Sequence, residues 1–141
     1  MSAERVNACM AGLFIFAIAA SAHAQSLSAG IWRNFDDNTG EAKAEVRIVE
    51  TPEGTRGRIE KLLAKSAKPD AKCEQCKDDR HNQPMVGLEI IRGDRILDPE
   101  NGREYRLRLT PVEGGRKLEV RGYLGPFYRT QTWVRAERVA P

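Results

Sequence analysis

The chain has 141 residues, of which 40% are hydrophobic and 30% are charged, and its net charge is +3. These values fit one soluble globular domain and exclude a disordered chain or a second domain of ordinary size. Basic and acidic residues are interspersed without a polybasic block, which argues against a dedicated binder of nucleic acid or of anionic membranes.

The first 24 residues have the pattern of a secretory signal peptide. Arg5 is a weakly basic start, residues 8–20 are apolar, and Ala22-His23-Ala24 is a small-x-small cleavage site. The apolar run is shorter than the roughly 20 residues of a membrane-spanning helix, although an uncleaved anchor is the alternative. We therefore expect cleavage after Ala24, a single domain over residues 25–141, a periplasmic or secreted location, and no stable membrane insertion after cleavage.

The segments that follow alternate polar and apolar side chains between regularly spaced turns, which is typical of antiparallel strands. Residues 55–63 also fit a helical spacing, and we interpret them as a strand. The predicted strands are residues 29–35, 43–50, 55–63, a strand with Val86, Leu88 and Ile90 on one face, Ile96-Leu97, a hairpin on either side of Glu113-Gly114, and 127–135. About eight hairpin-linked strands predict an all-β fold, an antiparallel up-and-down barrel with one long loop over about 64–84.

The hairpin around Glu113-Gly114 allows an explicit prediction of strand register. With the turn centred there, Leu109 faces Leu118 and Arg106 faces Arg121. A shift by one residue would set apolar side chains against charged ones, so the faces are well specified. The opposed arginines indicate either a solvated face or an anion between them.

Two cysteines remain in the chain once Cys9 leaves with the signal peptide. Cys73 and Cys76 form Cys-Glu-Gln-Cys within a polar loop. In an oxidising compartment such a pair usually forms a disulfide, which is our prediction. Two alternatives stay open: a zinc site that adds His81 with Asp78 or Asp79, and a redox-active dithiol.

Candidate ligand contacts come mainly from the last strand. Arg129, Gln131 and Trp133 share one face by the alternation of a strand, so a guanidinium, an amide and an indole would converge if that face points inward. The alternative is structural: Arg129 or Arg135 stacks on Trp32 and closes one end of the barrel. The ligand-binding candidates are Trp32, Tyr105, Arg121, Arg129, Gln131 and Trp133.

The sequence contains no recognisable catalytic constellation. His81 is isolated among polar loop residues, and the neighbouring Asp36 and Asp37 would point to opposite sides of an extended chain. The motifs of serine hydrolases, zinc peptidases and phosphate-binding loops are absent. We therefore predict no enzyme and no cofactor, with zinc only in the alternative above.

Several motifs in order along the chain resemble one family. The motifs are Gly30-Ile31-Trp32, residues 36–40, 57–63, 73–76, 82–88, 96–102, 120–125 and 129–133. The first is similar to the G-x-W signature of lipocalin-like (calycin) barrels, and the whole set resembles the DUF2147 family of exported bacterial proteins. This resemblance implies a lipocalin-like barrel and no particular reaction. The chain departs from the family pattern in the short link 92–95 and at Pro126-Phe127-Tyr128, both near an expected barrel mouth.

Three functional hypotheses follow. The first is an exported, non-catalytic barrel that binds one small amphipathic or apolar ligand, since the low aromatic content of 6% does not favour a roomy apolar cavity. The second is a metal- or thiol-responsive envelope protein that uses Cys73, Cys76 and His81. The third is an interaction protein with a solid barrel, which meets a partner through the 64–83 loop and the surface around Arg106 and Arg121.

Overall fold

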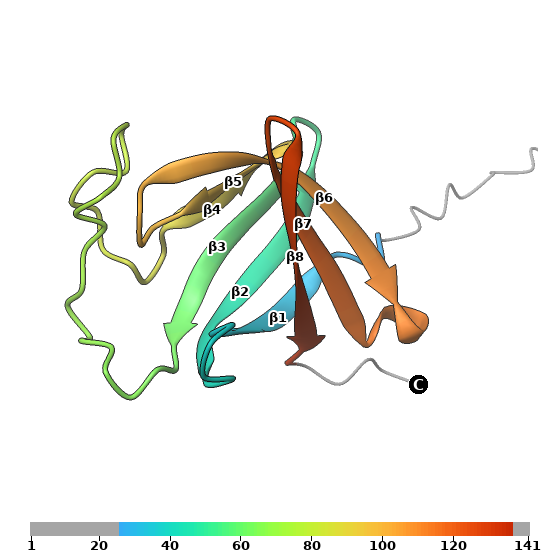
Figure 1. Ribbon diagram of the computed structural model, residues 1–141, viewed down its shortest axis with the longest axis horizontal. Coiled ribbons are helices and arrows are strands. Elements are labelled where there is room, and N and C mark those ends of the chain that lie inside the picture. The colour runs from blue at the N-terminus through green and yellow to red at the C-terminus, as the bar shows by residue number, and fades with distance from the viewer. Residues whose placement is uncertain (1–25, 137–141) are drawn as a thin grey trace, which may run out of the picture.

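A computed structural model describes residues 26–136, so the predicted signal peptide lies outside the described residues. The chain forms a closed barrel in which the strands follow one another in chain order (Figure 1). Every neighbouring pair is antiparallel, and β1 pairs with β8 to close the barrel. The strands are β1 (Gly30–Phe35), β2 (Ala42–Thr51), β3 (Gly54–Leu62), β4 (Glu89–Arg92), β5 (Arg95–Asp98), β6 (Arg103–Val112), β7 (Lys117–Leu124) and β8 (Phe127–Arg135). The predicted up-and-down barrel is confirmed.

The core follows from the alternation of side chains along the strands. On β2, Ala44, Val46 and Ile48 are buried inside the barrel, while the residues between them face outward. Two tryptophans are almost fully buried, Trp32 on β1 and Trp133 on β8. Among residues 26–136, no helix is long and apolar enough to cross a membrane.

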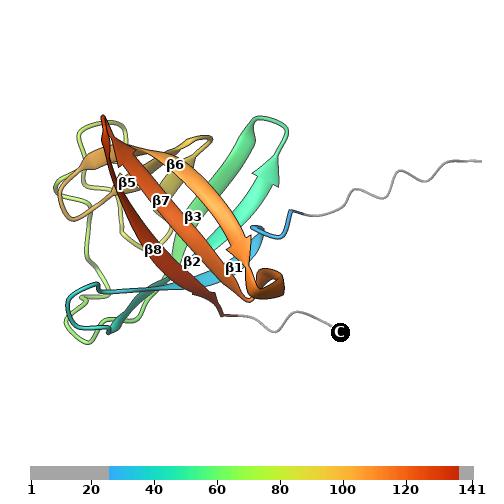
Figure 2. The same ribbon diagram turned by 45° about the vertical axis from the view of Figure 1, so that its right-hand side comes forward.

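The barrel has two ends with different connections. At the open end lie the links 36–41, 63–88, 99–102 and 125–126; at the closed end lie 52–53, 93–94 and 113–116. In Figure 2 the open end is on the left, with the β1–β2 link, the long loop and the β7–β8 turn, and the closed end is on the right. We use these two names below.

The predicted fourth strand began too early. Residues 86–88 belong to the long loop, which therefore covers 63–88 rather than about 64–84, and β4 begins at Glu89. Gly87 has φ +90°, which interrupts an extended strand, and Val86 is 47% exposed. Leu88 and Ile90 are buried as expected. Residues 54–62 form a strand rather than the alternative helix.

The predicted register of the β6–β7 hairpin was wrong by two residues. Leu109 pairs with Val120 instead of Leu118, and Arg121 lies opposite Arg108 instead of Arg106. The cause is the turn, which takes four residues between the pair Val112 and Lys117 and begins with a short 3-10 helix, η1 (Glu113–Gly115), rather than a two-residue turn. Because a shift by two preserves the faces, the inward and outward sets were still correct.

Candidate functional site

The open end of the barrel contains a cavity of about 500 Å³. Residues of all eight strands line it, and residues 64–71 of the long loop form one side. The deeper lining is apolar and includes Ala44, Ile59, Ile90, Leu97, Val120 and Trp133. The barrel is therefore hollow at this end.

A chain of polar contacts runs from this lining to the mouth. The Trp133 indole N–H donates to the Gln131 side-chain oxygen at 3.2 Å, and the Gln131 amide nitrogen donates to Asp37 at 3.0 Å. Arg129 forms an ion pair with the same Asp37 carboxylate. The three residues of β8 share the face that lines the cavity, as the alternation predicts, and Asp37 from the β1–β2 link contacts the polar ends of Gln131 and Arg129.

Asp37 was not among the candidate site residues, although the sequence places it in a recognisable turn. Asp36 accepts hydrogen bonds from the backbone N–H groups of Thr39 and Asn38, each at 2.9 Å. These bonds hold the pKa of Asp36 below its ordinary value. The turn made by Asp36 presents Asp37 to β8, a contact across 94 residues that no local pattern indicates.

A second polar group on the cavity wall is Asn34 at the end of β1. Its side-chain oxygen is buried and has no hydrogen-bond partner among the described residues. Because buried polar atoms are nearly always paired, this oxygen is available to a hydrogen-bond donor. The mouth also carries Lys43, which pairs with Glu100 at 2.6 Å, and the exposed Lys68.

Trp32 does not line the cavity. Its ring is fully buried at the closed end, where the Arg135 guanidinium lies 4.2 Å from the ring centroid. The Trp32 indole N–H donates to the Ser28 carbonyl oxygen at 2.8 Å, and Arg135 donates to the carbonyl oxygens of Gly115, Ala29 and Leu27. Trp32 thus has the surroundings that the structural alternative expects: an arginine stacks on its ring at one end of the barrel, and this arginine is Arg135.

The two remaining candidates, Tyr105 and Arg121, lie on opposite faces of the barrel wall. Tyr105 lines the cavity, but Arg121 points outward from β7, where it donates to the Thr130 hydroxyl at 2.9 Å and lies over the Tyr128 ring. The structure thus brings Tyr105, Gln131, Trp133 and Arg129 together around the cavity and separates Trp32 and Arg121 from them.

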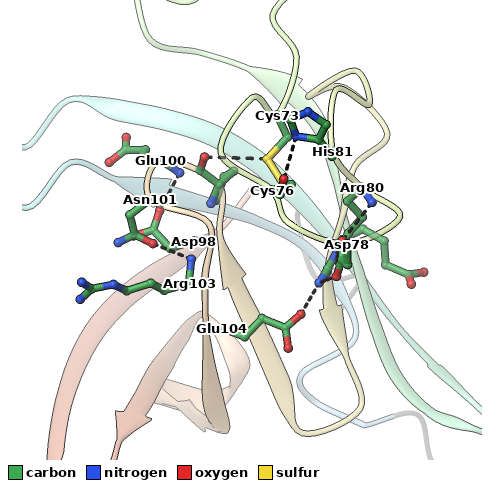
Figure 3. The surroundings of a disulfide bond; sticks show 12 residues. Cys73, Cys76, Asp78, Arg80, His81, Asp98, Glu100, Asn101, Arg103 and Glu104 are labelled. Atoms are coloured by element: carbon green, nitrogen blue, oxygen red, sulfur yellow. Dashed lines mark hydrogen bonds and ion pairs between the residues drawn. A yellow bond between two sulfur atoms is a disulfide. The ribbon is translucent and has the colours of Figure 1, made fainter.

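The long loop is fixed to the barrel by a disulfide segment (Figure 3). Cys73 and Cys76 are joined by a disulfide, as predicted. The segment lies against the β5–β6 link, where Gly102 approaches the Gln75 carbonyl so closely that a Cβ would lie 1.9 Å from its oxygen. Gly102 has φ +73°, so both its conformation and its contact require glycine. In the sequence the Asn101-Gly102 pair is typical of a turn, but it gives no sign of the contact with Gln75.

An arginine ties the second half of the loop to the barrel wall. Arg80 is buried, donates to the Glu89 carbonyl oxygen at 2.9 Å, and forms ion pairs with Asp78 and Glu104 (Figure 3). The hydrogen bonds from Arg80 hold the pKa of Asp78 well below its usual range. The loop beside the cavity is therefore anchored at both the disulfide and this arginine.

The zinc and redox alternatives find little support in this arrangement. Both sulfur atoms are engaged in the disulfide, and the cysteines are 1% and 2% exposed, whereas reactive thiols are partly accessible. The His81 Nδ1 contacts the Cys76 carbonyl oxygen at 2.8 Å. Within residues 26–136, no group of three or more His, Cys, Asp or Glu side chains is placed to hold a metal ion.

The fold of this chain, an eight-stranded antiparallel barrel with a cavity at one end, is that of lipocalin-like barrels. A solved structure described as "Protein HP1028 from the human pathogen Helicobacter pylori belongs to the lipocalin family" matches the chain with a TM-score of 0.64 and 16% identity, over 81% of this chain and 85% of that chain. At this identity the likeness concerns the fold alone.

The family follows from the sequence itself. The model of the DUF2147 family, described as "Uncharacterized protein conserved in bacteria", matches residues 30–135, and the chain belongs to this family. A search of curated proteins finds none that matches the sequence. The resemblance stated from the motifs is therefore confirmed.

Proposed function

We propose that this protein is an exported, non-catalytic carrier or sensor that holds one small amphipathic or apolar ligand in the cavity at the open end. The observation that carries the proposal is the cavity of about 500 Å³, because small-molecule sites are typically apolar hollows of roughly 300–1,000 Å³ with few polar groups. The third hypothesis expects a solid barrel, so the cavity favours the first hypothesis over it.

The distribution of polarity supports an amphipathic ligand. Ile59, Val120 and Trp133 give the apolar part of a ligand a dry surface. At the mouth, Asp37 and Arg129 supply charges of both signs, which suit a zwitterionic or hydrogen-bonding head group rather than a simple ion. The buried Asn34 oxygen would accept a hydrogen bond from a hydroxyl or N–H group of the ligand.

Two observations support export. The first 24 residues have the pattern of a signal peptide, and the chain contains a disulfide, a bond that persists mainly in oxidising compartments. We propose a periplasmic or secreted location on these grounds.

Native mass spectrometry of the chain purified from the exported fraction tests the proposal first. We expect a mass in excess of the chain that is lost on denaturation. The second step measures binding of N-phenyl-1-naphthylamine, a small apolar fluorophore, by its fluorescence. We expect saturable binding that Ala67→Trp weakens about tenfold or more, because Ala67 is a half-buried residue of the cavity wall.

The matched control is Val49→Trp, which adds the same side chain at an exposed position of β2 near the closed end. Its affinity for the fluorophore should equal that of the wild type. Equal binding by Ala67→Trp and the wild type would show that the fluorophore does not occupy the cavity. A clean chain mass with no saturable binding would refute the proposal and favour the interaction hypothesis.

A further inference from the structure

The outer face of β5, β6 and β7 carries an arginine patch formed by Arg95, Arg106, Arg108 and Arg121. Arg95 lies directly opposite Arg106, and Arg108 lies opposite Arg121. Like charges in these positions destabilise a sheet. None of the four forms an ion pair with a carboxylate among residues 26–136. Glu119 lies two residues from Arg121 on the same face of β7, so four arginines beside this carboxylate leave a local excess of positive charge that an anionic partner would neutralise.

Two tyrosines lie among these arginines. The Arg106 guanidinium is 5.2 Å from the centroid of the Tyr123 ring, and the Arg121 guanidinium is 4.5 Å from that of Tyr128. The two rings are 5.9 Å apart. Hydrogen bonding from Arg121 to the Tyr123 hydroxyl lowers the pKa of this tyrosine. Arginine and tyrosine thus form one continuous surface rather than separate side chains in solvent.

The patch continues into an apolar tip, the β7–β8 hairpin. Leu124, Phe127 and Tyr128 are 48%, 76% and 62% exposed, and Gly125-Pro126 is the turn between them. In Figure 2 this hairpin projects at the upper left of the barrel, at the open end. Together these three neighbouring side chains form an exposed apolar patch, the kind of surface that marks a contact with a protein or a membrane.

We propose that the β7–β8 hairpin and the arginine patch dock the protein reversibly on an anionic phospholipid surface. Leucine and aromatic side chains of the tip would enter the boundary between head groups and acyl chains, where amphipathic rings are favoured. The guanidinium groups behind the tip would bind lipid phosphates, for which arginine geometry is well suited. An apolar tip in front of a cationic face matches the order of acyl chains behind phosphates in a bilayer, and an acidic protein partner is an outcome that the test below distinguishes.

The sequence concealed this surface because its arginines are not consecutive. The absence of a polybasic block argued against a membrane binder, yet three strands bring four dispersed arginines together. The inference does not rest on the proposed ligand. It does place the cavity beside the bilayer, since Gly122 and Arg129 at the base of the hairpin line the cavity.

Vesicle cosedimentation tests this proposal with residues 25–141, which contain the whole barrel. The vesicles are phosphatidylcholine alone, or an equal mixture with phosphatidylglycerol. We expect binding to the anionic vesicles that weakens as salt is added. Each basic residue near an anionic surface strengthens association about fivefold, so Arg106→Gln/Arg108→Gln should weaken binding about 25-fold. Leu124→Ser/Phe127→Ser should weaken it by a similar factor.

The controls remove the same groups elsewhere: Val49→Ser, an exposed apolar residue of β2, and Arg116→Gln, an exposed arginine at the closed end. Both should bind as the wild type does, and all variants should keep the wild-type unfolding midpoint because the changed side chains are exposed. Equal binding to neutral and anionic vesicles, or equal losses in patch and control variants, would overturn the proposal. Failure to bind either vesicle, with retention on immobilised polyglutamate, would overturn it in favour of an acidic protein partner.

Discussion

The two ends of the barrel are built from the same alternating strands but differ in how far their connecting segments fill the interior. At the closed end, Arg135 stacks on Trp32 and donates to three carbonyl oxygens, so the tryptophan leaves no space beside it. Trp133 is equally buried, yet its ring forms part of the wall of the cavity that opens at the other end. Burial alone therefore does not distinguish a structural aromatic residue from one that borders a ligand site. What distinguishes them is whether the neighbouring links fill the barrel end.

The largest expected effect would come from removing each tryptophan in turn. Trp32→Ala should lower the free energy of unfolding by about 3–5 kcal/mol, because it empties a fully packed site. Trp133→Ala should cost at least about 1 kcal/mol less, because its ring already borders a cavity and makes fewer contacts to lose. Urea unfolding followed by circular dichroism gives both values. Equal losses of unfolding free energy would contradict this comparison, because they would show that the two tryptophans are packed alike.

A glycine substitution sharpens the comparison at the open end. Gly102→Ala should destabilise the protein by about 3 kcal/mol, because a positive φ is combined with a contact to the Gln75 carbonyl that cannot be kept. Gly40→Ala is the control: Gly40 has nearly the same φ, +74°, but open space around it, so about 1 kcal/mol is expected. Thermal unfolding and proteolysis of the 63–88 loop measure the two effects. If both variants lose the same stability, the disulfide segment does not depend on this contact.

The smallest expected effect is the loss of folding stability at acid pH. The folded-state pKa of Asp78 lies below its ordinary value of 3.8, so its pairing with Arg80 stabilises the fold above about pH 4 and is lost as the pH falls below 3.8 toward the folded value. Because Asp78 is 40% exposed, the contribution should be less than about 1 kcal/mol. Asp78→Asn should therefore reduce stability at pH 6 and reduce the loss between pH 4 and pH 3.

The control for this prediction is Asp70→Asn in the same loop, since Asp70 takes part in no ion pair among residues 26–136. The free energies of unfolding of the two variants and the wild type, measured at pH 6, pH 4 and pH 3, test this prediction. An acid profile of Asp78→Asn identical to that of the wild type would show that Arg80 does not depend on this carboxylate.

The sequence predicted those parts of the fold that local periodicity controls. Alternation placed Val46 and Ile48 inside, and it placed Gln131 and Trp133 on the cavity face. The register of β6 and β7 was missed because it depends on how many residues a turn takes, and Glu113–Gly115 adopts a conformation that the sequence does not mark.

The candidate site was only partly predictable, for a physical reason. Trp32 and Trp133 carry the same alternation signal, and only the docking of Arg135 and of the long loop separates their roles. Asp37 reaches Gln131 across the barrel mouth, a contact that exists only after the barrel closes. Such contacts between distant segments leave no trace in the spacing of a single sequence.

The contacts of Arg135 at the closed end also determine when the barrel can close. Arg135 binds the Leu27 carbonyl oxygen, and these residues are 108 positions apart. A chain made from its N-terminus cannot pair β8 with β1, or cover Trp32, until Arg135 has been made. Contacts between such distant segments form slowly, because the chain between them must first be brought into a closed loop. Until Arg135 docks, β1 therefore has a free edge on the side of β8, and the barrel cannot close.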